Sequence, residues 1–447
     1  MFEVFANLFK IPDLKRKILI TLGLLAVYRV GAFIPTPGID GAKLSQFFAN
    51  IAQTQGGTLF GMINMFSGGA IQRLTIFALG IMPYISASII LQLLTAVIPV
   101  LERLSKEGEE GRKKMIQYTR YGTIILAIIQ SFFIALWLEN PARFQGMQIV
   151  QFPGWSFRIL AVVTLTCGTA FIMWLGEQIQ EYGIGNGISL IISAGIISRI
   201  PAAIAQLVQL VTVSGEGAQL DPFTLVLMAF MLVGVIVAVV AITQGQRKIP
   251  IQYAKRIVGR KIYGGQSTYI PLRVNQAGVI PIIFAQSIIL FPATIAGLVP
   301  SQAIQNIATM LTRENVVYNL LYAGLIIFFC YFYTAITFNP IDISNNMKRF
   351  GGFVPGIRPG KQTAEYLDYI MTRITLPGAI FLAIIAVLPT LISRGLKIPY
   401  LVASFFGGTG LLIIVGVMLD TMRVIESHLL VRHYEGFMKK GRIKGRR

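Results

Sequence analysis

Residues 222–243 read PFTLVLMAFMLVGVIVAVVAIT, a nearly continuous apolar stretch without a charged side chain. A helix of about 20 such residues matches the ~30 Å hydrocarbon core of a bilayer. The chain has 447 residues, of which 54% are hydrophobic and 13% are charged. This composition is too apolar for an ordinary soluble domain and predicts an all-α polytopic membrane protein. The ten expected spans are residues 18–36, 73–98, 117–138, 159–178, 187–209, 222–243, 276–299, 316–338, 370–393 and 404–423.

The distribution of Lys and Arg predicts the orientation of these spans. Of 39 basic residues, 30 lie in or beside the N-terminal segment, the 2/3, 6/7 and 8/9 connections and the tail. Eight lie on the opposite side, where we place Arg199, and Arg29 lies inside the first span. Because basic connections stay in the cytoplasm, both termini are expected there. Apart from Arg29, expected to snorkel or to bond backbone carbonyls, we expect span interiors without ionisable groups.

The span count also predicts the domain organisation. An amphipathic cytoplasmic segment, residues 1–17, precedes a first half of five spans over residues 18–213. A second half follows over residues 214–423, and residues 424–447 form a basic cytoplasmic tail. Five spans per half with both ends on one side require the halves to be inverted, which places a functional centre at the midplane between them. No sequence repeat is obvious.

One external segment contains a short apolar stretch. Residues 59–70 read LFGMINMFSGGA, which is too short to cross a bilayer. A re-entrant half-helix, broken from the next span by two glycines, and an interfacial helix on the outer leaflet are both compatible with it. The two alternatives are equally supported by the residues alone.

Catalytic and cofactor chemistry is not indicated. The glycine-rich stretch at residues 183–187 follows a membrane span and lacks the lysine of a phosphate-binding loop. Cys167 and Cys330 lie inside spans, and His428 and His433 lie in a charged tail. No catalytic triad, paired carboxylates or metal cage can be recognised. We therefore expect neither an enzyme nor a bound cofactor.

Seven separated blocks of the sequence form a recognisable series: FIPTPGID (33–40), NMFSGG (64–69), FALGIMPYISAS (77–88), QYTRYG (117–122), GIGNGIS (183–189), GVIP (278–281) and VPGIRPG (354–360). In this order they resemble the SecY family of bacterial protein-conducting channels. The resemblance runs from about residue 10 to the tail. It implies a clamshell of two inverted five-helix halves around an hourglass pore, with a re-entrant plug helix.

The resemblance also implies particular roles for apolar residues. The ring at the waist of the pore corresponds to Ile81, Ile85, Ile188, Ile192, Ile283 and Ile413. A narrow apolar constriction excludes water and blocks ions, yet it can widen around an unfolded chain. The plug, within about residues 57–70, corresponds to Leu59, Phe60, Met62, Ile63, Asn64, Met65 and Phe66. Most isoleucines in such spans simply face lipid or other helices, so the ring depends on the resemblance.

Polar and basic positions follow from the same resemblance. Gln92, Asn186 and Asn275 correspond to a polar cluster at the lateral gate between spans 2/3 and 7/8, with helix contacts elsewhere as the alternative. Docking of a motor or a ribosome is implied for Arg247, Lys248, Lys255, Arg256, Arg260, Lys261 and Arg358. For the basic tail, the ribosome, the motor and anionic lipid remain as alternative binding partners. The family works with SecE, SecG, the SecA ATPase, the ribosome, signal peptides and nascent chains.

Two functions from different classes remain. The first is a passive pore-forming subunit that passes unfolded secretory proteins across the bacterial plasma (inner) membrane and releases transmembrane segments sideways into lipid. It would be driven by SecA or the ribosome. The alternative is a secondary transporter with inverted repeats. Coupled carriers usually keep ionisable groups at midplane, and their expected absence here favours the channel.

Overall fold

Two compact units make up the chain, and each is described by itself. The first comprises Met1–Ser214, Gly297–Pro300 and Ile413–Arg447, and the second comprises Gly215–Ala296 and Ser301–Leu412. The computed structural model describes residues 11–54, 67–144, 146–212, 222–253, 256–258, 261–263, 267–298, 316–396, 398 and 400–440. The residues predicted to form the plug, Leu59 to Phe66, therefore lie outside the described residues.

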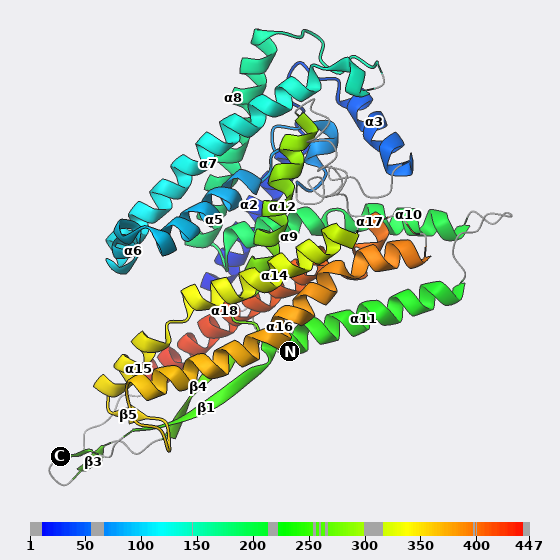
Figure 1. Cartoon of the computed structure of the whole chain (residues 1–447). Helices are drawn as coiled ribbons and strands as arrows, with labels where there is room; N and C mark the ends of the chain where they lie inside the picture. Colours follow the sequence, from blue (N-terminus) through cyan, green and yellow to red (C-terminus); the bar gives the residue numbers. More distant parts are fainter. Residues whose placement is uncertain are drawn as a thin grey trace. The chain divides into compact units, whose positions relative to one another are not determined.

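The first unit is helical, and Figure 1 labels its α-helices. Its elements are α2 (Pro12–Gly31), α3 (Gly41–Thr54), η1 (Ala70–Arg73), α5 (Met82–Val97), α6 (Pro99–Lys106), α7 (Glu109–Leu138), η2 (Pro141–Phe144), α8 (Trp155–Tyr182), α9 (Gly187–Ile197) and α10 (Ile200–Thr212). The last helix, α18 (Thr409–Lys440), belongs to this unit from Ile413 onward. The long helices α7 and α8 lie side by side, and α5 packs on α7.

The second unit combines helices with two small sheets. Its elements are α11 (Pro222–Gln244), β1 (Gln246–Tyr253), β2 (Arg256–Val258), β3 (Lys261–Tyr263), β4 (Ser267–Arg273), α12 (Ile280–Leu298), α14 (Val316–Thr337), α15 (Pro340–Arg349), β5 (Gly352–Phe353), α16 (Lys361–Leu396) and α17 (Tyr400–Ala403). One sheet has the antiparallel order β4-β1-β5, and β2 pairs with β3. The predicted all-α fold did not include these strands.

The predicted spans correspond to helices of the structure. Among the described residues, six helices are long and apolar enough to cross a bilayer, and the bent pair α5–α6 makes a seventh crossing if it counts as one span. Helices α2, α12 and α18 occupy the positions of the predicted first, seventh and tenth spans. The boundaries differ at the second span, which begins at Met82 and not at residue 73. Left-handed backbone at Leu74 and Gly80 prevents a helix there.

The fifth predicted span is two helices with a break between them. Helix α9 ends at Ile197 and α10 begins at Ile200, with Pro201 in its first turn. Arg199 lies in this break, inside the segment 187–209 that is apolar enough to cross a membrane. The expectation that this span has no ionisable group in its interior is therefore wrong. A proline in the first turn fits a new helix start, because its missing N–H leaves no helical bond unmade.

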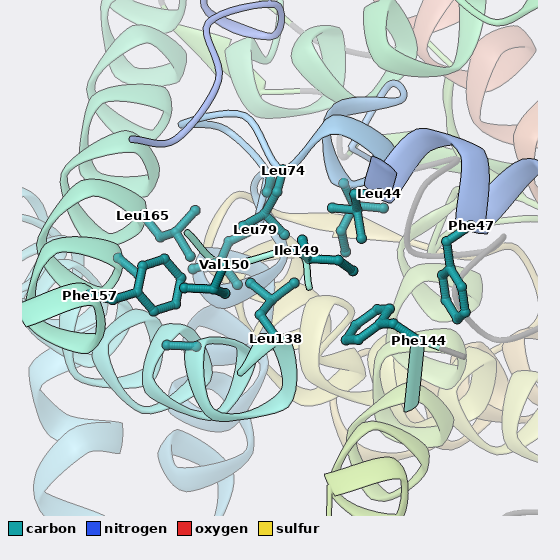
Figure 2. Packing of buried hydrophobic residues seen from close by; sticks show 14 of the residues in the cluster. Leu44, Phe47, Leu74, Leu79, Leu138, Phe144, Ile149, Val150, Phe157 and Leu165 are labelled. Atoms are coloured by element: carbon teal, nitrogen blue, oxygen red, sulfur yellow. The ribbon is translucent and has the colours of Figure 1, made fainter. Parts of the chain in front are cut away.

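A hydrophobic core joins the connections 1/2 and 3/4 of the first unit (Figure 2). Residues of α3, the segment 74–79, η2, the 149–150 segment and α8 meet in this core, where Leu44, Phe144 and Leu165 are fully buried. Backbone bonds reinforce it, because Asp40 N donates to Ile149 O over 2.9 Å. The described parts of the 1/2 connection are thus packed on one another, which fixes the position at which the chain returns to α5.

Candidate functional site

The predicted ring isoleucines begin two helices of the first unit. Ile81 precedes α5 and Ile85 lies in its first turn, where Ile85 N donates to Ile81 O over 3.1 Å. Ile188 and Ile192 lie one turn apart on α9. Each pair therefore shares one helix face, because residues four apart stack along a helix.

Most of the six isoleucines are packed against protein. Ile81, Ile85, Ile192 and Ile413 are 6% exposed or less, and Ile283 is 9% exposed. Ile188 is partly buried, and its Cγ1 lies 3.0 Å from the position that a Cβ on Gly176 of α8 would occupy. Ile283 lies on α12 in the second unit, while the other five belong to the first unit. The ring itself stays a prediction.

The three predicted gate amides bond within their own segments. Gln92 Nε2 donates to Ser88 Oγ over 3.4 Å, and Asn275 Nδ2 donates to Gly278 O over 3.1 Å. Asn186 Oδ1 accepts from the backbone N–H groups of Ile188 and Ser189 at 3.1 and 3.2 Å. Asn186 is thus the N-cap of α9, a role that satisfies two helix donors. The N-G-I-S order could have suggested this cap, since Asn is a preferred capping residue.

The prediction for Arg29 is confirmed. Its Nη1 donates to the carbonyl oxygen of Gly68 over 3.0 Å, and its guanidinium carbon lies 4.8 Å from the centre of the Phe33 ring. The carbonyl bond and the ring contact both suit a cation in apolar surroundings. Gly68 directly follows Ser67, the first described residue after the predicted plug.

A further charged pair was missed by the sequence analysis. Arg120 on α7 meets Glu177 on α8 in a two-pronged salt bridge, with Nε–Oε1 and Nη2–Oε2 distances of 2.7 and 2.8 Å. The two residues are 57 positions apart, so no local pattern could pair them. The bridge ties the predicted third and fourth spans together near the ends that were assigned to the cytoplasm.

The basic residues of the 6/7 connection lie on or beside β-strands. Arg247 and Lys248 are exposed on β1, and Lys248 Nζ lies 4.7 Å from the centre of the Tyr269 ring on β4. The backbones of Arg256 and Lys261 belong to the paired strands β2 and β3. Lys255 and Arg260 lie outside the described residues.

The 6/7 and 8/9 connections form one sheet. Gln252 of β1 pairs with Phe353 of β5, which lies between α15 and α16. A buried cluster holds this region together and consists of Ile249, Ile251, Leu272, Phe338, Met347, Val354, Leu367, Ile370 and Met371. The alternation of Ile249 and Ile251 with exposed residues was the available sequence signal for β1.

Arg358 is presented by an ordered turn of this region. Its side chain is exposed, and its backbone carbonyl accepts a bond from Thr363 Oγ1 over 2.9 Å. The turn is held a second time by Ser344 Oγ, which donates to Gly360 O over 2.6 Å. A fixed backbone with a free guanidinium is suited to recognising an acidic or phosphate partner.

Comparison with known proteins identifies the family. A protein-family model described as SecY matches residues 75–422. The chain belongs to the SecY family. It is 50% identical to the protein translocase subunit SecY of Escherichia coli K12, over 97% of this chain and 96% of that protein. The protein translocase subunit SecY of Mycobacterium bovis is 49% identical, over 98% of this chain and 100% of its own length.

Solved structures show the same fold at lower sequence identity. A structure titled as that of a protein-conducting channel matches with a TM-score of 0.60 and 18% identity, and 92% of each chain is covered. Sec61 in a canine ribosome–channel complex matches with a TM-score of 0.57 and 17% identity, again over 92% of each chain. The predicted fold class, a multi-pass helical membrane protein of the SecY type, is confirmed. Membership of the SecY family assigns the chain to protein translocation and disfavours the secondary transporter.

Proposed function

We propose that this chain is the pore-forming subunit of a protein-conducting channel in the bacterial inner membrane, with both termini in the cytoplasm. The observation that carries the proposal is the 50% identity, over almost the whole chain, to a protein translocase subunit. The excess of basic residues in the 2/3, 6/7 and 8/9 connections supports the orientation. The halves are residues 18–213 and 214–423, with residues 424–447 as a cytoplasmic tail that contacts ribosome, motor or anionic lipid.

The six isoleucines 81, 85, 188, 192, 283 and 413 form the apolar waist of this channel. Their uncharged side chains would exclude ions at rest and yet offer no specific contacts to a passing polypeptide. Residues 59–66 form the plug. A solved relative, matched with a TM-score of 0.58, is described as having a plug domain that stabilises its closed state and maintains a membrane seal. Gln92, Asn186 and Asn275 contribute polar groups at the lateral gate.

The cytoplasmic sheet and the Arg358 turn receive the machinery that supplies energy. Arg247, Lys248 and Arg358 are exposed on one packed region, which supports a joint docking surface for SecA or the ribosome. Two solved neighbours are described as ribosome-bound channel complexes. Cationic side chains on an ordered surface suit the phosphates of ribosomal RNA and acidic groups of a motor. SecE and SecG are the expected small membrane partners.

Photocrosslinking from the channel to a stalled secretory chain tests the proposal. A crosslinking amino acid is placed at Ile85 on α5 or at Ile283 on α12, in membrane vesicles that contain the full complex. The matched control position is Phe230 on α11, which is 78% exposed and apolar. Adducts with the secretory chain are expected at the two isoleucines and not at Phe230. Equal labelling at all three positions, or none at the isoleucines, contradicts a pore at this place.

A further inference from the structure

The segment after Ser67 is joined to the end of the first span by backbone bonds. Thr36 N donates to Leu74 O over 3.0 Å, and Ile76 N donates to Ile34 O over 3.0 Å. The segment between these bonds and Gly68 is short and tightly turned, because it contains η1 and the left-handed residue Leu74. Its path is therefore defined at the end that leads into α5.

Arg29 supplies a side-chain tie at the other end of this segment. It lies in the last turn of α2, and its Nη1 reaches Gly68 O over 3.0 Å. Among the described residues Arg29 forms no salt bridge, so the Gly68 carbonyl and the Phe33 ring are the groups that stabilise its charge. A charged donor to a carbonyl in an apolar setting makes a stronger bond than a neutral donor.

Gly68 in turn lies against α9. A Cβ at Gly68 would be 3.1 Å from the Cα of Gly195 and 3.4 Å from its carbonyl oxygen, so two backbones meet without side chains between them. The φ angle of Gly68 is +63°, which a glycine adopts at no steric cost. Gly195 is buried and lies one turn after Ile192, a residue of the proposed waist.

These contacts connect Arg29 to the helix that carries two waist residues. We infer that Arg29 is a specificity-determining positioning residue: its bond to Gly68 holds the Ser67–Gly69 backbone against Gly195 of α9 and so keeps α9 in the resting position. This inference rests on the proposed channel function. Displacement of α9 relative to the Ser67–Gly69 segment would break the Gly68–Gly195 contact. A signal sequence must therefore supply enough binding free energy to open the channel against this contact.

The inference predicts a relaxed signal requirement when the tie is removed. Arg29→Met provides an unbranched apolar side chain comparable to the aliphatic stem of arginine, but it has no group that can donate to Gly68 O. Loss of one charge-assisted bond shifts the resting equilibrium toward opening by roughly ten-fold or more. A secretory protein with a weakened signal sequence should then be exported at least several-fold better, relative to the same protein with its normal signal.

The matched control is Arg73→Met. Arg73 lies over the same Phe33 ring at 5.5 Å, but it is exposed and donates to no backbone carbonyl within the described part of the chain. Its replacement should leave the export ratio unchanged. A second test variant, Gly68→Ala, keeps the arginine at position 29 and forces the two backbones apart, because the added methyl is strained at a positive φ and lies 3.1 Å from Gly195 Cα and 3.4 Å from Arg29 Nη1. It should relax the signal requirement in the same direction.

Export ratio, protein level and unfolding midpoint are measured for each variant in the full complex. A purely structural role of Arg29 would lower the midpoint and reduce export of both signal types in parallel. That result, or an unchanged ratio in both Arg29→Met and Gly68→Ala at normal protein level, overturns the inference. Failure of the channel proposal is recognised separately, because the crosslinking variants at Ile85 and Ile283, with Arg29 and Gly68 unchanged, would then give no adduct.

Discussion

Gly187 offers a sharp test of the packing that places α9 on α8. A Cβ at this position would overlap the carbonyl oxygen of Gly176, and it would lie 2.8 Å from that carbonyl carbon and 2.9 Å from Ile179 Cβ. Gly187 does not have a positive φ, so alanine could adopt its backbone conformation. The cost of Gly187→Ala is therefore steric. The two helices must separate, and Ile188 must leave its place beside Gly176.

The magnitude follows from the rigidity of the contact. Overpacking of a tight core costs about 1–3 kcal/mol, and here the opposing group is backbone and not a flexible side chain. We therefore expect Gly187→Ala to lower the free energy of unfolding by about 3 kcal/mol, at the upper end of this range. Gly234→Ala on α11 and Gly324→Ala on α14 are matched controls, because nothing lies within 4 Å of their added methyl groups. They should stabilise by roughly 0.5–1 kcal/mol through lower backbone entropy in the unfolded chain.

Tryptophan fluorescence in detergent micelles can follow this unfolding. Trp174 lies on α8, two residues before Gly176, and so reports on the helix that must move. The expected result is a lower thermal midpoint for Gly187→Ala and an equal or higher midpoint for both controls. Equal midpoints for Gly187→Ala and wild type would refute the close α8–α9 contact. A fall of the same size in the controls would show that alanine is harmful at any of these glycines.

Two further predictions address the Asn186 cap and the Arg358 turn. Asn186→Ala should lower the free energy of unfolding by about 1 kcal/mol, and Asn339→Ala at the similar cap of α15 should do the same. Asn186→Asp retains the capping oxygen and should keep most of the stability. A change of signal selection in Asn186→Asp at normal stability would show that the amide NH2 acts at the gate. Arg358→Glu should abolish motor-driven export while ribosome-driven insertion survives better, and Lys361→Glu, an exposed charge reversal nearby, should spare both. Parallel loss of both activities in Arg358→Glu, measured with an exported and an inserted reporter, would contradict a motor-specific role.

Much of the fold could be predicted because the bilayer imposes a simple rule on sequence. A span must be apolar over about 20 residues, so ten segments were recognisable from composition. The carbonyl partner expected for Arg29 was confirmed for the same reason, since a cation within a span needs a polar neighbour. Span ends were predicted less well. Leu74 and Arg199 lie in apolar stretches, where hydropathy does not reveal a left-handed residue or a helix break.

The sheet of the 6/7 and 8/9 connections was missed for a different reason. Strand β1 has an alternating pattern, but its partner β5 has two residues and lies about 100 positions away, which no local pattern indicates. The pairing of Arg120 with Glu177 likewise joins residues that lie 57 positions apart on two helices. Side chains that pair between two helices produce no periodic pattern in the sequence.

The amino-acid sequence alone was enough to predict a membrane protein, the number of its spans, and the connections that carry the positive charge. These properties depend on the transfer free energy of individual side chains, which is additive along the chain and needs no knowledge of contacts. Two contacts could be found only in the folded structure. Gly68 contacts Gly195 beside Arg29, and α8 contacts α9 through Gly176 and Gly187. Such contacts depend on the absence of side-chain atoms at two distant positions at once, and they become visible only when the helices are packed.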